Sequence, residues 1–592
     1  MKSKTSWNLK LLYKSDTDPQ IEKDLKTIEQ ACAGFEREYR NISFTDSPEN
    51  LAVALGSYEE VENKLNGSKP WWYFALKSSL DKSDTKVGAK ATKNEQRITE
   101  AVNRIKFFPL AIAKIPEKEQ KRFLNHSDLK SRAYFLQNIF KRAKFNLSEG
   151  EEQLEDLLSQ TSYTMWVDAQ ERLLNKQTVS HKGKDIPIVK AMSELREMPK
   201  ADRRAVYEKS IAVMKSISDL SEGEINAVYN YKKIMDNRRG RPNPHSSTVM
   251  GFENDEKAID GLVSLVTKRF PVAHRFYKLH AKIIGEKKLH MADRNINMGK
   301  IKATFDFNAS VSILRSILAR LDKEYVEIFD SFLENGQIDV YPKKGKEGGA
   351  YCWGQGMLPT FVLLNHVNNV YSLKTLAHEI GHAIHNELSK RQPIQYRKYS
   401  TATAEVASTF FEQIVSEEIE KHLSEKEKII LLHEQLLGDI STIFRQIACF
   451  NFELELHKKI RSAGQLSKED IAALLVQHLK SYLGDAVEVK GDDGYFYVVW
   501  THIRRFFYVY TYAYGQIISR ALYEKWKEDP SYGAKVKQFL TSGRSMSPED
   551  IFKSIGIDTS KPSFFEAGIK GIEKDIDRLE KLFNASSRQK SR

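Results

Sequence analysis

The chain has 592 residues, of which 41% are hydrophobic and 29% are charged. This length exceeds one ordinary domain and predicts two or three subdomains with sizeable cores. The net charge is +13, yet basic and acidic residues are interleaved and no helix-turn-helix, zinc-finger or RNA-binding signature occurs, so we expect a solvated basic surface and no nucleic-acid partner.

The cysteines and the length of the apolar stretches indicate in which cellular compartment the protein is expected. Cys32, Cys352 and Cys449 are odd in number and far apart, which excludes a disulfide framework and suits a reducing compartment. No stretch approaches about 18 uninterrupted apolar residues, so we expect no membrane span. The positively charged residues 1–5 are followed by Trp7-Asn8-Leu9-Lys10, which is not the apolar segment of a signal peptide. We therefore expect a cytoplasmic protein.

Helical periodicity dominates the chain. Apolar residues recur at helical spacing in six long stretches, and 16 prolines and 30 glycines are few for this length. We therefore predict a mainly α fold. The stretches are residues 22–39, 95–113, 149–174, 202–235, 256–284 and 310–334. Between the third and the fourth, the polar residues 181–187 predict either a domain boundary or a loop within one domain.

Three other stretches lack this periodicity. Residues 337–370 contain five glycines and end near the run 359–365, which predicts a short strand, either internal to a sheet or free to pair with an extended peptide. Residues 487–497, with two glycines and two aspartates, predict a flexible loop. The polar and basic residues 587–592 predict a disordered tail.

Residues 378–382, His-Glu-Ile-Gly-His, carry the strongest chemical pattern. Ser372 can cap a helix that runs through them. On that helix His378 and His382 project from one face, about 6 Å apart along the axis, so both imidazoles can hold one Zn²⁺. Glu379 is poorly placed to ligate the same ion, but its carboxylate can take a proton from a water that attacks a carbonyl. The motif predicts a zinc peptidase.

A candidate third ligand follows downstream. Glu405 lies within the small, apolar stretch 402–407, where a carboxylate needs a partner such as a metal ion. Glu412 is two turns further on the same face, where it can either orient a ligand histidine or form an ordinary salt bridge. We therefore predict that His378, His382 and Glu405 hold one zinc ion per chain.

Two more residues of the motif helix need an explanation. Glycine costs about 1 kcal/mol relative to alanine inside a helix, so Gly381 indicates the close approach of either a neighbouring helix or a substrate backbone. His385 lies near the face of His378 but about 10 Å away along the axis. We predict that His385 supports the site or the fold and is not a ligand.

An aromatic run at residues 501–515 contains further candidate groups. Hydrolysis at zinc creates an oxyanion, to which a tyrosine hydroxyl or a histidine can donate. Tyr508 and Tyr512 are four residues apart and would share a helix face, with His502 shortly before them. The alternative is core packing, in which the tyrosines bury their rings.

These blocks resemble a known family, the thimet-oligopeptidase-like zinc peptidases, and within it the bacterial oligoendopeptidase F branch. The match rests on residues 378–382, on Glu405 with the three residues that follow it, and on His502 with residues 507–510. Residues 7–13 also look like the N-terminus of this family. The similarity therefore extends over nearly the whole chain.

The resemblance implies a mainly α, elongated molecule with two lobes. A deep channel between the lobes would contain the zinc, admit short unstructured peptides and exclude folded proteins. The edge strand of a small sheet would lie above the zinc, which fits residues 359–365. Gly349, Ala350 and Tyr351, which precede that strand, are expected to contact substrate.

The resemblance also implies roles for single residues. His378, His382 and Glu405 would be the ligands and Glu379 the general base. In the aromatic run, the positions that bind substrate and stabilise the oxyanion are matched by three residues, His502, Tyr508 and Tyr512. Tyr510 and Tyr514 compete with them as donors, and Tyr510 is included among the expected substrate contacts.

We expect four regions and one main function. The regions are a helical N-terminal region (1–110), a helical domain of the oligopeptidase F N-terminal type (111–187), a catalytic zinc peptidase domain (188–582) and a basic disordered tail (583–592). The expected function is zinc-dependent endopeptidase activity on oligopeptides, in a monomer or simple homo-oligomer. Two alternatives are a carboxypeptidase or dipeptidase on the same scaffold, and a non-catalytic peptide- or nucleic-acid-binding protein that has kept a metal site.

Overall fold

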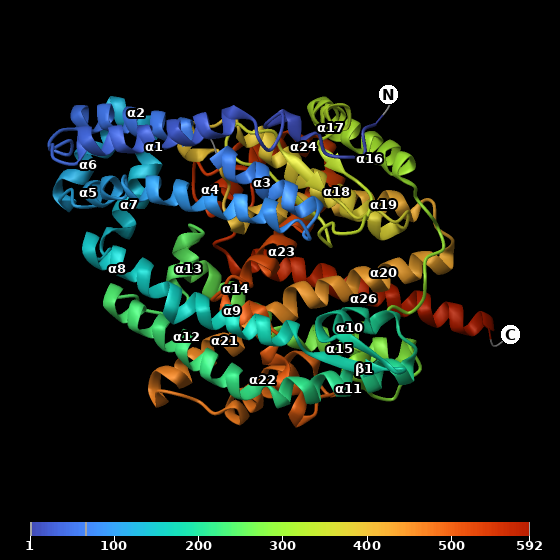
Figure 1. The fold of residues 1–592 in the computed structure, drawn as a ribbon. Coiled ribbons are helices and arrows are strands. Elements are labelled where there is room, and N and C mark those ends of the chain that lie inside the picture. Colours follow the sequence, from blue (N-terminus) through green and yellow to red (C-terminus); the bar gives the residue numbers. More distant parts are fainter. Residues whose placement is uncertain (1–2, 66–67, 591–592) are drawn as a thin grey trace. The chain divides into compact units, whose positions relative to one another are not determined.

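The structure, a computed structural model, describes residues 3–65 and 68–590 (Figure 1). The described chain is mainly helical, which confirms the predicted fold class, and it divides into two compact units. The first unit comprises the chain up to Glu149, Ala303–Lys421 and Leu522–Ile555. The second comprises Gly150–Lys302, His422–Ala521 and the chain from Gly556 onwards.

The first unit combines helices with one small sheet. Its N-terminal helices pack on one another, with α1 in contact with α2, α3 and α4. The helices are α1 Pro19–Tyr39, α2 Pro48–Leu65, α3 Lys69–Leu80, α4 Thr85–Asn103, α5 Phe107–Ala113, α6 Glu117–Asn125, α7 Ala133–Ala143, α16 Phe307–Leu321, α17 Lys323–Asn335, α18 Val370–Ser389, α19 Thr401–Glu420, α24 Gly533–Thr541 and α25 Pro548–Ser554.

The sheet of the first unit has the strand order β4-β6-β5, with β4 Ile338–Asp339, β5 Tyr351–Trp353 and β6 Phe361–Leu363. Strand β6 pairs parallel with β4 and antiparallel with β5. The strand expected within residues 359–365 is confirmed, but its expected position at the sheet edge is wrong. All three residues of β6 are fully buried, and such a continuous apolar run belongs in the centre of a sheet. The edge position falls to β5.

The second unit is helical with two small pairs of strands. Helix α23 Tyr510–Glu528 begins in this unit and continues into the first. The other elements are α8 Glu149–Ser159, α9 Met165–Asn175, β1 Thr178–His181, β2 Lys184–Pro187, α10 Ile188–Glu194, α11 Lys200–Ser216, α12 Ser218–Arg239, α13 Ser246–Gly251, α14 Glu256–Lys268, α15 Phe270–Ile283, β3 Leu289–His290, α20 Glu425–Asp439, α21 Arg445–Ala463, α22 Lys468–Leu483, β7 Val487–Glu488 and α26 Pro562–Lys590.

Most predicted helical stretches are interrupted in the structure. Residues 22–39 lie in one helix, α1, but the stretch 310–334 is split into α16 and α17. Asp322 at the break has an extended backbone, and its carboxylate caps α17 by accepting a hydrogen bond from the Glu324 amide. The stretch 256–284 is likewise split before α15, where Pro271 occupies the first turn. A proline cannot supply the amide of a continuing helix.

Two segments that lack helical periodicity, one expected as a domain boundary or a loop and the other as a flexible loop, form ordered elements. Residues 181–187 belong to the antiparallel hairpin β1–β2 inside the second unit, with Lys182 and Gly183 in its turn at positive φ. Residues 487–497, expected as a flexible loop, comprise β7 and part of a 3-10 helix, Gly491–Val498. A Cβ on Gly494 would collide with the backbone of Ala472. Packing against α22 therefore orders this segment.

The remaining general predictions concern the termini, the cysteines and membranes. Helix α26 covers the predicted tail as far as Lys590, and residues 591–592 lie outside the described residues. All three cysteines are free thiols. Within residues 3–65 and 68–590, no helix combines the length and the apolar character that crossing a membrane requires.

Helices α18 and α19 approach each other at Gly381. A Cβ at this position would lie 2.8 Å from Ser408 Cα, 2.9 Å from Phe411 Cδ2 and 3.2 Å from the Ala407 carbonyl oxygen. Two of these atoms belong to backbone, which cannot move aside as a side-chain end can. The neighbouring helix, and not a substrate backbone, therefore explains the glycine.

We predict that Gly381→Ala lowers the thermal stability of the protein. The added methyl group forces α18 and α19 apart, and overpacking of this kind costs about 1–3 kcal/mol. The measurement is the midpoint of thermal unfolding. Gly56→Ala in α2 is the matched control, because nothing lies within 4 Å of a Cβ at that position and the helix gains about 1 kcal/mol in propensity. Equal midpoints for the two variants would show that the contact is not tight.

Candidate metal centre and active site

Local sequence starts helix α18 ahead of the motif. Asn369 is the N-cap: its Oδ1 accepts a hydrogen bond from the Ser372 amide at 2.8 Å and another from Ser372 Oγ at 2.9 Å. The prediction that Ser372 is the cap is therefore wrong. Ser372 lies in the first turn, and its hydroxyl also accepts the Val367 amide at 3.0 Å. The helix begins at Val370 and carries His378 and His382 in its middle.

Three donor atoms converge where α18 meets α19. Glu405 Oε2 lies 3.4 Å from His378 Nε2 and 3.7 Å from His382 Nε2. Zinc bonds of about 2.0–2.1 Å to tetrahedral ligands place the ligand atoms about 3.3 Å apart. Two imidazoles and one carboxylate are also a donor set that zinc prefers. The residues that the sequence predicted as ligands therefore fit a zinc ion.

Glu412 contacts His378 from a position two turns beyond Glu405 on α19. Its Oε2 lies 3.3 Å from His378 Nδ1, and its Oε1 lies 3.1 Å from Lys374 Nζ. A hydrogen bond from Nδ1 to a carboxylate leaves Nε2 of the same ring available for a metal. Both arrangements considered for Glu412 occur together: one carboxylate oxygen contacts a predicted ligand histidine, and the other forms a salt bridge with Lys374.

The centre concentrates negative charge. Burial alone would lower the pKa of His378, but the carboxylates of Glu405 and Glu412 outweigh burial and raise it to about 10. Burial opposes the charged form of Glu405 as well, yet the two histidines lower its pKa to about 2. In Glu412, Lys374 and His378 overcome burial and lower the pKa to about 2. Both carboxylates are therefore ionised at neutral pH and favour a bound cation.

Glu379 differs from these carboxylates. Its side chain is buried, and burial together with the negative charge of Glu405 and Glu412 raises its pKa to about 7. His378 and a hydrogen bond from the Cys352 amide act in the opposite direction. A carboxylate with a pKa near the working pH can both accept and return a proton. Its position next to a predicted ligand on α18 is compatible with the general base that the sequence predicted.

Strand β5 reaches the centre through the backbone of Cys352, whose amide donates to Glu379. Gly349 and Ala350 lead into this strand. Gly349 has a φ of 77°, and its carbonyl oxygen accepts a hydrogen bond from Asn365 Nδ2 at 2.7 Å. The ring of Tyr351 packs edge-on against Trp7 at 6.2 Å. The strand edge, and not the tyrosine ring, is therefore the part of β5 next to the centre.

His385 serves the packing of α18. It is fully buried, and its ring stacks on Tyr399 with centroids 3.8 Å apart and an interplanar angle of 9°. Phe539 of α24 lies 5.2 Å from it. Burial and the nearby His382 lower the pKa of His385 to about 3, which keeps the ring neutral. It is not one of the three converging donors, as the spacing predicted.

The second unit brings together three residues of the aromatic run. His502 lies in the 3-10 turn Thr501–Arg504, and its Nδ1 is 2.5 Å from the hydroxyl of Tyr508. The Tyr512 hydroxyl donates to the Tyr508 hydroxyl at 3.5 Å. Burial and the nearby Arg445 and Arg505 lower the pKa of His502 to about 4. A neutral histidine and two tyrosine hydroxyls thus form one hydrogen-bonded group.

Tyr510 and Tyr514 lie on the other side of this segment. Both are fully buried. The Tyr510 hydroxyl donates to Asn254 Oδ1 at 2.8 Å, and the Tyr514 hydroxyl donates to Thr559 Oγ1 at 3.4 Å. Tyr510, which was expected to contact substrate, is instead packed in the interior of the unit. The hydroxyls of Tyr510 and Tyr514 therefore bond within the protein interior, whereas those of Tyr508 and Tyr512 belong to the group around His502.

A strained loop presents His502 and Tyr508. Phe506 and Phe507 have φ values of 44° and 63°, and a bulky residue at positive φ costs about 1–3 kcal/mol. The Phe507 amide donates to both carboxylate oxygens of Glu453, each at 2.9 Å. Thr248 Oγ1 donates to the Phe506 carbonyl at 2.8 Å. These bonds offset the strain and hold the loop.

A buried ion pair secures the other end of the loop. Arg504 donates to the two carboxylate oxygens of Glu224 at 2.9 and 2.7 Å, and both side chains are buried. Arg504 also donates to the Tyr497 and Trp500 carbonyls. A bidentate pair of this kind sets the orientation of the guanidinium. The backbone around His502 is therefore held at several points.

Sequence reasoning missed Glu224, Glu453 and Arg504. For Glu453 a signal was present, because the residue stands between Phe452 and Leu454 in an apolar stretch. A carboxylate there needs a partner, the argument that identified Glu405. Nothing local distinguishes Glu224 or Arg504 from surface charges, since each is defined by its distant partner.

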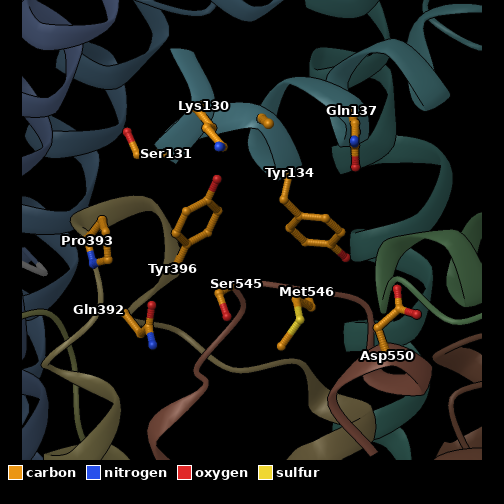
Figure 2. A pocket seen from close by; sticks show the side chains of 11 residues that line it. Lys130, Ser131, Tyr134, Gln137, Gln392, Pro393, Tyr396, Ser545, Met546 and Asp550 are labelled. Atoms are coloured by element: carbon orange, nitrogen blue, oxygen red, sulfur yellow. The ribbon is translucent and has the colours of Figure 1, made fainter. Parts of the chain in front are cut away.

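The first unit also has a hollow of about 460 Å³ that is separate from the candidate metal centre (Figure 2). The rings of Tyr134 and Tyr396 stand beside each other in it, with centroids 6.4 Å apart. Its other lining residues are Lys130, Ser131, Ala133, Gln137, Gln392, Pro393, Ser545, Met546 and Asp550. None of the predicted site residues lines it.

We predict that Glu453→Ala frees the loop around His502. The Phe507 amide then loses both acceptors, a change worth about 1–3 kcal/mol for a buried donor. Hydrogen–deuterium exchange of a peptide covering residues 501–509 should become faster by about tenfold or more. Glu453→Gln keeps one acceptor oxygen and should change exchange much less. Glu455→Ala on the same helix is the control, and equal exchange in all three variants would contradict the assigned restraint.

Comparison with known proteins identifies the family. The sequence profile of peptidase family M3 matches residues 197–571, and that of oligopeptidase F matches residues 112–178. Oligopeptidase PepF of Bacillus subtilis is 28% identical, covering 98% of this chain and 88% of that protein. The oligoendopeptidase F homolog of Lactococcus lactis subsp. lactis is 24% identical, covering 98% and 97%.

Solved structures share the fold. The crystal structure of oligoendopeptidase-F from Enterococcus faecium superposes with a TM-score of 0.70 and 18% identity, covering 96% of this chain and 98% of that one. The family profiles cover more than half of the chain and include the histidine motif, Glu405 and the aromatic run. The chain therefore belongs to the zinc-dependent metalloendopeptidases of peptidase family M3, in the oligopeptidase F subfamily.

Proposed function

We propose that this chain hydrolyses internal peptide bonds of short, unstructured oligopeptides at one catalytic zinc ion. The observation that carries the proposal is the convergence of His378, His382 and Glu405 beside the buried Glu379. Membership of family M3 supports a metallopeptidase reaction. The names of the relatives, oligopeptidase and oligoendopeptidase, support oligopeptides as substrates and endopeptidase cleavage.

In this proposal the residues of the first unit divide the work. His378, His382 and Glu405 hold the ion, and Glu412 keeps the ring of His378 in its orientation. When bound, zinc supplies a Lewis acid that acidifies water and polarises the scissile carbonyl. Glu379 removes a proton from the attacking water and returns a proton to the amine that leaves. The Cys352 amide holds the Glu379 carboxylate during both transfers.

Strand β5 and the aromatic group are the proposed substrate contacts. An extended peptide can add to the β5 edge through backbone hydrogen bonds, which are independent of side-chain identity. Gly349 and Ala350 would border the peptide there. From the family resemblance we propose that His502, Tyr508 and Tyr512 bind substrate and donate to the oxyanion. The neutral state of His502 and the two hydroxyls suit this role, because each can donate without carrying a charge.

We expect cleavage of a quenched oligopeptide that depends on metal. A chelator should abolish cleavage, and added zinc should restore it. Mass spectrometry of the products should show internal cuts, whereas stepwise loss of terminal residues would indicate the carboxypeptidase or dipeptidase alternative. A stably folded protein offered as substrate should remain intact. Cleavage that persists in chelator, or no cleavage after zinc loading, would contradict the proposal.

We expect Glu379→Gln to retain zinc and to lose turnover. The glutamine has nearly the same shape but accepts no proton, and general acid–base catalysis contributes about 10²- to 10⁴-fold. The measurements are kcat on the quenched oligopeptide and zinc content per chain. The matched control is Glu387→Gln on the same helix, since Glu387 pairs with Lys390 away from the converging donors. A Glu379→Gln variant with the wild-type rate would show that another group is the base.

A further inference from the structure

A second group of potential metal ligands lies in the second unit. It consists of His245, which directly precedes α13, and of Glu256 and Asp260, one turn apart on α14. One donor atom from each of the three residues lies within 4.8 Å of the other two. Apart from the catalytic centre, this is the one such group within residues 3–65 and 68–590.

His245 is oriented toward the two carboxylates. The residue is 4% exposed, and the rings of Phe450 and Phe507 lie 5.6 and 5.7 Å from its own. His245 Nε2 lies 3.1 Å from Asp260 Oδ1 and 3.4 Å from Glu256 Oε1. Neither ring nitrogen forms a hydrogen bond within the described chain. The contacts therefore have the length of hydrogen bonds but not their direction.

The same pattern occurs at the catalytic centre. There His378 Nε2 and His382 Nε2 lie 3.4 and 3.7 Å from Glu405 Oε2, as ion-pair distances and not as aligned hydrogen bonds. Donor atoms that point at a shared ion are separated by about 3.3 Å and do not point at one another. The distances of His245 Nε2 from Asp260 and Glu256, 3.1 and 3.4 Å, are as close to this spacing as those of the catalytic group.

The surroundings suit a cation that exchanges with solvent. Ser246 Oγ and Asn243 Nδ2 donate to Glu256 Oε1 at 2.9 and 2.7 Å and so fix the orientation of that carboxylate, as groups around metal ligands commonly do. The Asp260 side chain is 53% exposed, which leaves one side open to water ligands. With a neutral imidazole, the two carboxylates give the group a charge of −2.

We propose that His245, Glu256 and Asp260 form a second divalent-cation site, which binds a transition ion of the Zn²⁺ or Mn²⁺ type. One imidazole and two carboxylates are the donor set that such ions accept. The residues are distinct from the catalytic ligands, so the proposal does not rest on the proposed peptidase reaction. The competing arrangement is an ion pair between a protonated His245 and the two carboxylates, with no metal.

Zinc stoichiometry tests the site. The full-length chain, without an affinity tag, is stripped with a chelator, dialysed against buffered Zn²⁺ and assayed for zinc by mass spectrometry. The wild type should bind two zinc ions per chain. Asp260→Asn should bind one and keep its rate on the quenched oligopeptide. Asp485→Asn, an exposed aspartate of the same unit, is the control and should bind two.

Substitutions at the catalytic centre separate the two sites. His382→Ala should retain one zinc ion, and the double variant His382→Ala with Asp260→Asn should retain none. If Asp260→Asn folds poorly, Glu256→Gln tests the same site and should also bind one zinc ion.

A wild type that binds a single zinc ion, which His382→Ala removes, would overturn the second site and leave the ion pair. Two ions retained in both Asp260→Asn and Glu256→Gln would also overturn it. A single ion that Asp260→Asn removes would instead contradict the proposed catalytic metal.

Discussion

The candidate metal centre depends on the close packing of helix α18 against helix α19. Gly381 lies between the two motif histidines, and the Ser408 backbone that it contacts follows Glu405 by less than one turn. The point of closest approach and the point where the ligands converge are therefore the same place. A side chain at residue 381 would separate the helices and move the Glu405 carboxylate away from both imidazoles. The missing side chain thus sets the ligand distances.

Different charged partners then give three nearby carboxylates different proton affinities. Glu405 and Glu412 contact cationic partners, and their pKa values fall to about 2 despite burial. Glu379 is buried against β5 with fewer compensating contacts, and its pKa rises to about 7. The difference in pKa follows from where each carboxylate lies on the two packed helices, α18 and α19, and from which charged groups it contacts. Glu405 and Glu412 therefore stay ionised and attract a cation, whereas Glu379 can exchange a proton near neutral pH.

In the second unit, the hydrogen-bonded group of His502, Tyr508 and Tyr512 depends on strain that buried charges hold in place. Two phenylalanines at positive φ reverse the chain between His502 and Tyr508. Glu453 binds the Phe507 amide, and the Glu224–Arg504 pair holds the preceding turn. An uncompensated carboxylate in such surroundings is costly, so the loop and its anchors stabilise one another. The geometry of the aromatic group therefore depends on residues far from it in sequence.

Local sequence determined the helical content, the placement of His378 and His382 on one helix face, and the identification of Glu405. The helical period decides which side chains share a face. A carboxylate among small apolar residues requires a cationic or hydrogen-bonding partner, because an unpaired buried charge is costly. The i,i+4 spacing of Tyr508 and Tyr512 was predictable on the same ground. Tertiary structure decided the rest.

Which strand forms the sheet edge, which helix fills the space at Gly381, and which distant carboxylate receives the Phe507 amide are relations between segments far apart in the chain. No local pattern specifies such relations, because they depend on packing across the whole unit. The predicted cap at Ser372 was wrong because Asn369 and Ser372 are both good capping residues. The path of the chain into α18 selects Asn369. The sequence by itself therefore identified the residues of the candidate site, and the packing of distant segments decided their geometry.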